Sequence, residues 1–173
     1  GRDPGAVAAK NIYEKDFTLS MSKELCKEIR RLKGKYNYRC LLTRNTDKYL
    51  SLRQRIKKAN EKNGDLFLSL HLNASHRKAA HGFEVYYLNT VTDKYAKNLV
   101  ARENKDPEID QVDLILAELT IKTYVQDSIR AGKLLTGSYD NAFSGKNFKT
   151  RNLGLKNALF YVLMGANMPS LLV

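Results

Sequence analysis

The chain has 173 residues, of which 43% are hydrophobic, so it is long enough for one well-packed core and short for two separate domains. Charged residues make up 28% and there are only three prolines, which argues against a disordered or fibrous protein. The formal net charge of +12 favours an anionic partner such as nucleic acid, a membrane surface or an acidic polymer. No apolar stretch approaches the roughly 20 residues of a membrane helix, so we expect no transmembrane segment.

Predicted helices and strands alternate along the chain, with polar loops over 104–111 and 136–152. In order they are a helix over 14–33, a strand over 37–43, a helix over 51–63, strands over 65–71 and 83–88, helices over 92–102 and 112–135, and strands over 158–163 and 170–173. Because crossover helices must cover the sheet that they connect, this order predicts an α/β sandwich: a mostly parallel twisted sheet flanked by helices on both faces.

Both ends of the sequence interrupt structure. The chain opens on the turn-rich residues 1–6 and finishes inside an apolar strand pattern at Val173. We therefore expect a single domain over 1–173 that is clipped at both ends, in a natural protein that continues beyond them.

Two reactive side chains belong to elements that meet at one edge of a parallel sheet. His71 ends the most apolar predicted strand, and Glu14 begins the first helix. By position alone, His71 is typical of a hydrogen-bonded strand-end histidine and Glu14 of a helix-start carboxylate favoured by the helix dipole. Together they also fit two of the three protein ligands of a catalytic zinc site, and position does not decide between these interpretations.

The remaining candidates are weaker. Cys26 and Cys40 either form one disulfide or remain thiols, and their spacing matches no metal motif. The basic residues are spread over several segments, which is more typical of solvated faces than of a nucleic-acid surface, so we expect no nucleic-acid partner.

Seven ordered motifs resemble the zinc-dependent N-acetylmuramoyl-L-alanine amidases of the amidase-3 type, and they cover nearly the whole chain. The motifs are Gly-Arg-Asp-Pro-Gly-Ala (1–6), Tyr-Glu-Lys-Asp (13–16), Leu-Thr-Arg-Asn-Thr-Asp (42–47), Leu-Arg-Gln-Arg (52–55) with Ala-Asn (59–60), Asp-Leu-Phe-Leu-Ser-Leu-His-Leu-Asn-Ala (65–74), Gly-Phe-Glu-Val-Tyr-Tyr-Leu (82–88), and residues 157–173.

This resemblance implies a peptidoglycan hydrolase that uses Zn²⁺ to cut the amide bond between the lactyl group of N-acetylmuramic acid and L-alanine of the stem peptide. It implies that Glu14 and His71 are zinc ligands and makes Asn73 a substrate-side candidate. The family's other zinc histidine would precede Gly1, and its general-base glutamate would follow Val173, so no catalytic base is expected within 1–173. The implied location is the bacterial cell envelope, periplasmic or secreted, with a role in wall remodelling and daughter-cell separation.

The stretch from residue 96 into the long helix also resembles a periplasmic subgroup in which an inserted helix covers the zinc until an activator protein removes it. The loop over 104–111 is then a regulatory segment, and Glu103, Glu108 and Asp110 are candidates for an autoinhibitory carboxylate. An exposed acidic loop is the simpler interpretation. Two alternatives remain for the function: a zinc exopeptidase acting on ordinary peptides, and a non-catalytic basic module that binds the wall or nucleic acid. The sequence does not indicate an oligomeric state.

Overall fold

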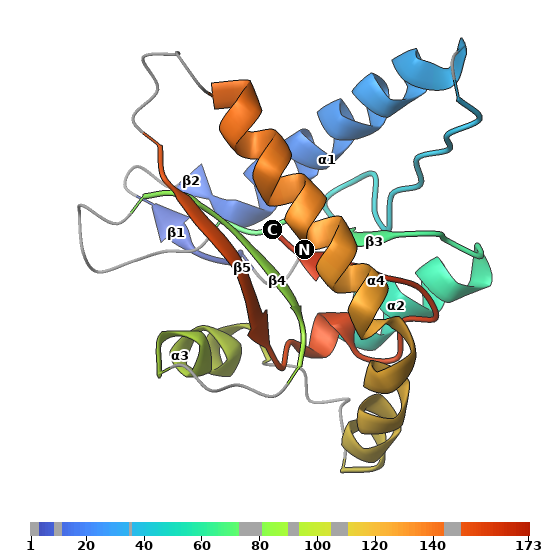
Figure 1. The fold of residues 1–173 in the computed structure, drawn as a ribbon, viewed down its shortest axis with the longest axis vertical. Helices are drawn as coiled ribbons and strands as arrows, with labels where there is room; N and C mark the ends of the chain where they lie inside the picture. The colour runs from blue at the N-terminus through green and yellow to red at the C-terminus, as the bar shows by residue number, and fades with distance from the viewer. Residues whose placement is uncertain are drawn as a thin grey trace. The chain divides into compact units, whose positions relative to one another are not determined.

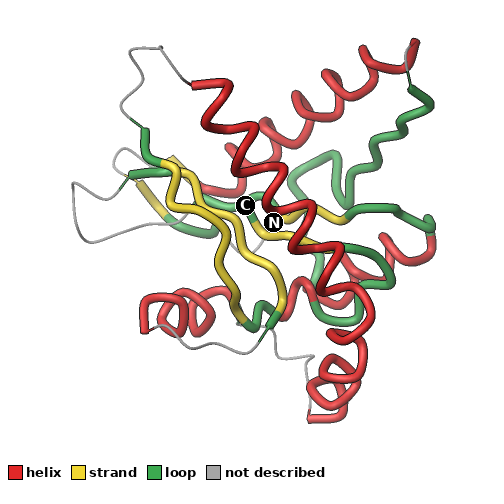
Figure 2. The backbone as a smooth tube through the Cα atoms, in the orientation of Figure 1, coloured by secondary structure: helices red, strands yellow, loops and turns green. Residues whose placement is uncertain are grey.

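A computed structural model describes residues 4–8, 12–34, 36–72, 81–89, 94–104, 111–143 and 150–173. Its backbone contacts divide the chain into two compact units, which we treat separately. The first unit comprises Gly1–Leu50 and Leu70–Ala74, and the second comprises Ser51–Ser69 and Ser75–Val173. Figures 1 and 2 show the elements of both.

The first unit is built on one long helix. The helix α1 (Glu14–Arg31) continues into a 3-10 turn, η1 (Leu32–Gly34), as the helical periodicity of 14–33 predicts. It follows a short antiparallel pair that sequence patterns did not predict, β1 (Val7–Ala8) and β2 (Ile12–Tyr13). This pair brings the turn at residues 4–6 back to the start of α1.

The predicted strand over 37–43 is wrong, because these residues form an irregular segment (green in Figure 2). A disulfide joins Cys40 to Cys26 of α1, with their Cα atoms 5.2 Å apart. The guanidinium of Arg30 also donates a hydrogen bond to the Cys40 carbonyl at 3.3 Å. The segment is therefore attached to a helix rather than paired in a sheet, although Tyr38 and Thr43 have high strand propensity.

The second unit contains a four-stranded sheet in the order β3-β6-β4-β5. Its strands are β3 (Phe67–Ser69), β4 (Phe83–Leu88), β5 (Asn152–Ala158) and β6 (Ser170–Leu172). The pairs β3–β6 and β4–β5 are parallel, whereas β4–β6 is antiparallel. The predicted α/β fold with a mostly parallel sheet is thus confirmed.

The second unit also contains the helices α2 (Leu52–Glu61), α3 (Lys94–Glu103) and α4 (Gln111–Phe143). The long helix α4 packs against β4, β5 and β6, and Figure 1 shows it lying alongside β4 and β5. Helix α4 runs eight residues beyond the predicted end at residue 135, so the predicted loop over 136–152 is wrong in its first half. Tyr139, in this extension, stacks on Phe83 with ring centroids 4.3 Å apart. Tertiary packing therefore extends the helix through residues of modest helix propensity.

The predicted strand over 158–163 is also wrong, because β5 ends at Ala158 and a 3-10 turn, η2 (Tyr161–Leu163), follows. Asn104 fixes this turn: its side chain donates to the Leu159 carbonyl at 2.7 Å and accepts from the Tyr161 N–H at 2.8 Å. The apolar run that suggested a strand instead supplies core side chains, including Phe160 and Leu163, which are almost wholly buried.

Candidate metal centre

A turn at Pro4–Ala6 replaces the usual side-chain cap at the start of α1. The preceding residue, Tyr13, makes no capping hydrogen bond with its side chain. Instead the N–H of Glu14 donates to the Ala6 carbonyl at 2.9 Å, and the N–H of Lys15 donates to the Pro4 carbonyl at 3.2 Å. Two otherwise unsatisfied donors of the first helical turn are thereby bonded.

The same turn also holds the Glu14 side chain. The Ala6 N–H donates to Oε2 of Glu14 at 2.7 Å. The Leu72 N–H donates to Oε1 at 2.9 Å, from a segment 58 residues further along the chain. Each carboxylate oxygen therefore accepts a backbone hydrogen bond. One donor, Ala6, precedes Glu14 in the sequence, and the other, Leu72, follows it.

The structure brings Glu14 and His71 into contact, as the metal-site interpretation requires. Nδ1 of His71 lies 3.2 Å from Oε1 of Glu14, and the two side chains are only 18% and 8% exposed. Both residues belong to the first unit. The two predicted ligands therefore form one buried carboxylate–imidazole pair.

The surroundings of Glu14 keep its carboxylate ionised. Burial by itself raises the pKa of Glu14, but the hydrogen bonds from His71, Ala6 and Leu72 outweigh it and leave the pKa below its ordinary value. An ionised carboxylate is the form that binds a metal ion.

The pair fits a zinc ion. With metal–ligand distances of about 2.0–2.2 Å in a tetrahedral site, two ligand atoms are expected roughly 3.3–3.6 Å apart. The observed separation of 3.2 Å is close to this value. Among the residues that the structure describes, no cluster of three or more His, Cys, Asp or Glu side chains is suited to a metal ion, so Glu14 and His71 remain two candidate ligands.

The other predicted site residues lie elsewhere or outside the described residues. Glu103 ends α3 in the second unit, where its carboxylate lies 3.3 Å from the guanidinium of Arg102. Asn73 and Glu108, together with Asp110, fall outside the described ranges. The structure therefore shows Glu14 and His71 in contact, and every site assignment, theirs included, stays a prediction.

Sequence patterns missed the contacts that hold Lys15, next to the candidate ligand Glu14. The Lys15 ammonium lies 2.6 Å from the Asp47 carboxylate and lowers the pKa of Asp47 to about 2. Arg44 donates from Nη2 to the Lys15 carbonyl at 2.5 Å. Both partners belong to the motif 42–47, but nothing in its spacing indicates that one contacts the carbonyl and the other the ammonium of Lys15.

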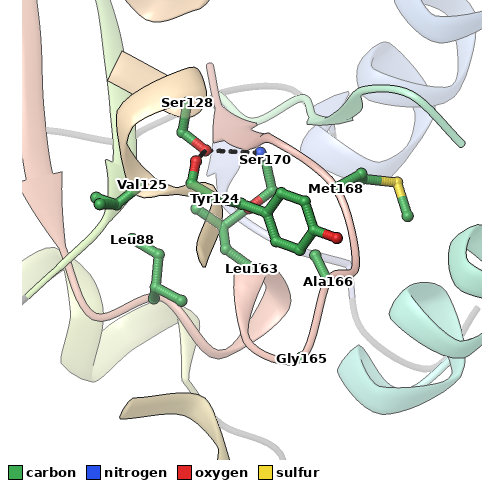
Figure 3. A pocket seen from close by; sticks show the side chains of 9 residues that line it. All are labelled: Leu88, Tyr124, Val125, Ser128, Leu163, Gly165, Ala166, Met168 and Ser170. Atoms are coloured by element: carbon green, nitrogen blue, oxygen red, sulfur yellow. Dashed lines mark hydrogen bonds between the residues drawn. The ribbon is translucent and has the colours of Figure 1, made fainter. Parts of the chain in front are cut away.

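The second unit holds a small pocket beneath α4, drawn in Figure 3. Its volume of about 20 Å³ is little more than one water molecule requires. Ser128 of α4 accepts a hydrogen bond from the Ser170 N–H at 3.0 Å beside it (Figure 3). This pocket is too small for a substrate, and its contacts join the helix to β6.

Fold and site together define an α/β domain with a buried carboxylate–imidazole pair suited to a divalent metal. The model of the N-acetylmuramoyl-L-alanine amidase family called Amidase_3 matches residues 1–173, so the chain belongs to that family.

Relatives and solved structures agree with this assignment. The chain is 30% identical to the N-acetylmuramoyl-L-alanine amidase AmiC of Neisseria meningitidis serogroup B, over all of this chain and 42% of AmiC. It is 28% identical to LytC of Bacillus subtilis, over 99% of this chain and 26% of LytC. The solved amidase of Clostridium difficile 630 shares 26% identity at a TM-score of 0.58, over 99% of this chain and 72% of that one. The catalytic domain of CwlV from Bacillus (Paenibacillus) polymyxa has the same fold, at 22% identity and a TM-score of 0.59, over 99% of this chain and 72% of that domain.

The chain spans about two fifths of AmiC, at 42% of its length. Within the described residues, every helix is too short or too polar to cross a membrane.

Proposed function

We propose that the protein is a zinc-dependent amidase that hydrolyses the bond between the lactyl group of N-acetylmuramic acid and L-alanine of the stem peptide. The observation that carries this proposal is the buried contact between Glu14 and His71, 3.2 Å apart, in a chain of the amidase family. Family membership supports the substrate class and reaction, and the pair supports the metal.

Glu14 and His71 are the residues that would hold the ion. Bound there, zinc would supply a water of lowered pKa and polarise the scissile carbonyl. The chain's own contribution is to keep the Glu14 carboxylate ionised and oriented by the Ala6 and Leu72 N–H groups. The general base remains a prediction outside residues 1–173, as does the second zinc histidine, and Asn73 remains a substrate-side candidate.

We further propose that the protein acts on peptidoglycan in the cell envelope, periplasmic or secreted, during wall remodelling and cell separation. The disulfide between Cys26 and Cys40 supports this location, because such bonds persist mainly in oxidising compartments.

The deciding experiment uses the full-length protein and its Glu14→Ala and His71→Ala variants. Zinc content by atomic emission and release of stem peptides from purified peptidoglycan are measured for each. We expect about one zinc per wild-type molecule and a loss of both metal and activity in the variants, because removal of one ligand leaves the other without its partner. Lys27→Ala, at an exposed ion pair with Glu24 on the same helix, is the control and should change neither quantity.

Three results would contradict this proposal, the first in its site and the other two in its function. Retention of zinc and activity by both variants would remove Glu14 and His71 from the site. A metal-free wild-type protein that binds the wall or nucleic acid with strong salt dependence would support the non-catalytic basic module instead. Release of amino acids from ordinary peptides, without release of stem peptides, would indicate an exopeptidase.

We also propose that the acidic segment before α4 restrains activity until an activator protein displaces it, with Glu103 or Glu108 as the restraining carboxylate. Asn104 must be kept in any test, because its side chain fixes the turn at Leu159 and Tyr161. Deletion of residues 105–110 from the full-length protein should therefore raise stem-peptide release several-fold. Glu103→Ala and Glu108→Ala then identify the carboxylate, and unchanged activity in all three variants would reject the restraint.

A further inference from the structure

The residue that follows the proposed ligand Glu14 is held from two sides by one irregular segment. The Arg44 guanidinium donates to the Lys15 carbonyl at 2.5 Å. The Asp47 carboxylate pairs with the Lys15 ammonium at 2.6 Å. One contact thus fixes the backbone of residue 15 and the other fixes its side chain, immediately beside the metal ligand.

These contacts act on the first turn of α1. The first turn of a helix lacks intrahelical acceptors for its N–H groups, so its orientation depends on outside partners. The outside partners here are the turn at Pro4–Ala6, whose carbonyls accept two of these N–H groups, and the segment containing Arg44 and Asp47, which binds the carbonyl and the side chain of Lys15. Loss of either partner would let the first turn shift and carry the Glu14 carboxylate away from His71.

The segment itself depends on the disulfide. Residues 36–50 contain neither helix nor strand, so no ladder of backbone hydrogen bonds holds them. Cys40 is tied to Cys26 of α1, and Arg44 follows only four residues later. Because a chain extends at most about 3.6 Å per residue, the disulfide confines Arg44 to a short distance from α1.

We propose that Arg44 and Asp47 are positioning residues for the Glu14 ligand, and that the Cys26–Cys40 disulfide keeps their segment against α1, so that the oxidised protein binds zinc more tightly than the protein without the bond. This inference rests on the proposed zinc site. Residues that orient metal ligands typically change metal affinity about 10- to 100-fold when removed.

The test measures zinc dissociation constants of the full-length protein by competition with a chromogenic chelator. The variants are Arg44→Ala, Arg44→Lys, Asp47→Asn and the double variant Cys26→Ala/Cys40→Ala. The double variant replaces chemical reduction, because added or newly freed thiols would themselves bind zinc. Arg31→Ala is the matched control, since Arg31 lies on α1 and pairs with the exposed Glu28.

We expect Arg44→Ala and the double cysteine variant to raise the dissociation constant about tenfold or more, with a smaller rise for Asp47→Asn and none for Arg31→Ala. Arg44→Lys keeps the charge and one donor nitrogen but loses the forked guanidinium, so it should fall between Arg44→Ala and wild type. Urea denaturation of each metal-free variant shows whether it is folded, and zinc dissociation constants are compared only among folded variants. Lower midpoints with unchanged dissociation constants would show a purely structural role and overturn the proposal.

The Glu14→Ala variant separates two kinds of failure. If Glu14→Ala loses zinc while the Arg44 and cysteine variants keep wild-type affinity, the positioning proposal is wrong and the metal site stands. If Glu14→Ala itself keeps wild-type affinity, the proposed metal site is wrong and the positioning proposal falls with it.

Discussion

Gly5 lies at a position where a side chain would collide with the proposed metal ligand. Its φ is +69°, in the left-handed region that residues with a Cβ rarely adopt. A Cβ there would lie 2.5 Å from Oε2 and 2.8 Å from Cβ of Glu14. Glycine at this position therefore lets the turn close on Glu14 near enough for the Ala6 N–H to reach the carboxylate.

We predict that Gly5→Ala weakens zinc binding at least tenfold, because the added methyl group must displace Glu14 or open the turn. The unfavourable φ should also lower the free energy of unfolding by about 1–3 kcal/mol. Chelator competition and urea denaturation of the full-length protein measure the two effects. Gly137→Ala is the matched control: a Cβ at Gly137 has no neighbour within 4 Å, so it should keep zinc and gain about 0.5–1 kcal/mol. Wild-type zinc affinity in Gly5→Ala would contradict the prediction.

The two ligand candidates were predictable from the sequence, but their surroundings were not. Resemblance to the amidase motifs singled out Glu14 and His71, whereas position alone left each with an ordinary structural explanation. The groups that orient Glu14 are mainly backbone N–H donors, those of Ala6 and Leu72, and every non-proline residue has such a donor. Only the fold determines which of them reach the carboxylate.

At the scale of elements, predictions succeeded where helix signals were local and failed where apolar runs had another cause. The helix predicted over 51–63 is of the successful kind, and the structure shows that Ser51 caps its first turn. The Ser51 hydroxyl accepts from the Gln54 N–H, and the Gln54 side chain accepts from the Ser51 N–H, which is the capping box at the start of α2. The apolar runs at 37–43 and 158–163 resemble strands. However, a disulfide attaches the first run to α1, and hydrogen bonds from Asn104 hold the second run in a turn. Strand propensity is a local property and carries no information about partners that are distant in the sequence.

Ser51→Ala should destabilise the protein by about 1–2 kcal/mol, because the cap is lost and the N–H of Gln54 is left without its acceptor at a site where Ser51 is 1% exposed. Urea denaturation followed by far-ultraviolet circular dichroism measures this change. Ser20→Ala, at an exposed position of α1, removes a hydroxyl without removing a cap and should stay within about 0.5 kcal/mol of wild type. Equal effects of the two substitutions would argue against the cap as the cause.

For the whole molecule, the charge of +12 acquires a specific interpretation once the chain is placed in the amidase family. A basic protein is attracted to an anionic wall polymer over distances comparable to the Debye length, which is about 10 Å at 0.1 M salt. The described surface offers a way to vary this charge, because four exposed ion pairs lie on its helices. They are Lys27 with Glu24, Arg31 with Glu28, Lys57 with Glu61 and Arg130 with Asp127.

Neutralising either side of these four pairs breaks the same contacts but changes the charge in opposite directions. Glutamine at the four basic positions lowers the formal charge from +12 to +8 (12 − 4), while amides at the four acidic positions raise it to +16 (12 + 4). In a His71→Ala background, which prevents digestion under the proposed function, we expect the first set to pellet less with purified peptidoglycan at 50 mM NaCl and the second set to pellet more. The difference should vanish near 1 M NaCl, where the Debye length is about 3 Å. If both sets weaken binding equally, the ion pairs themselves matter and long-range attraction by net charge does not govern binding to the wall.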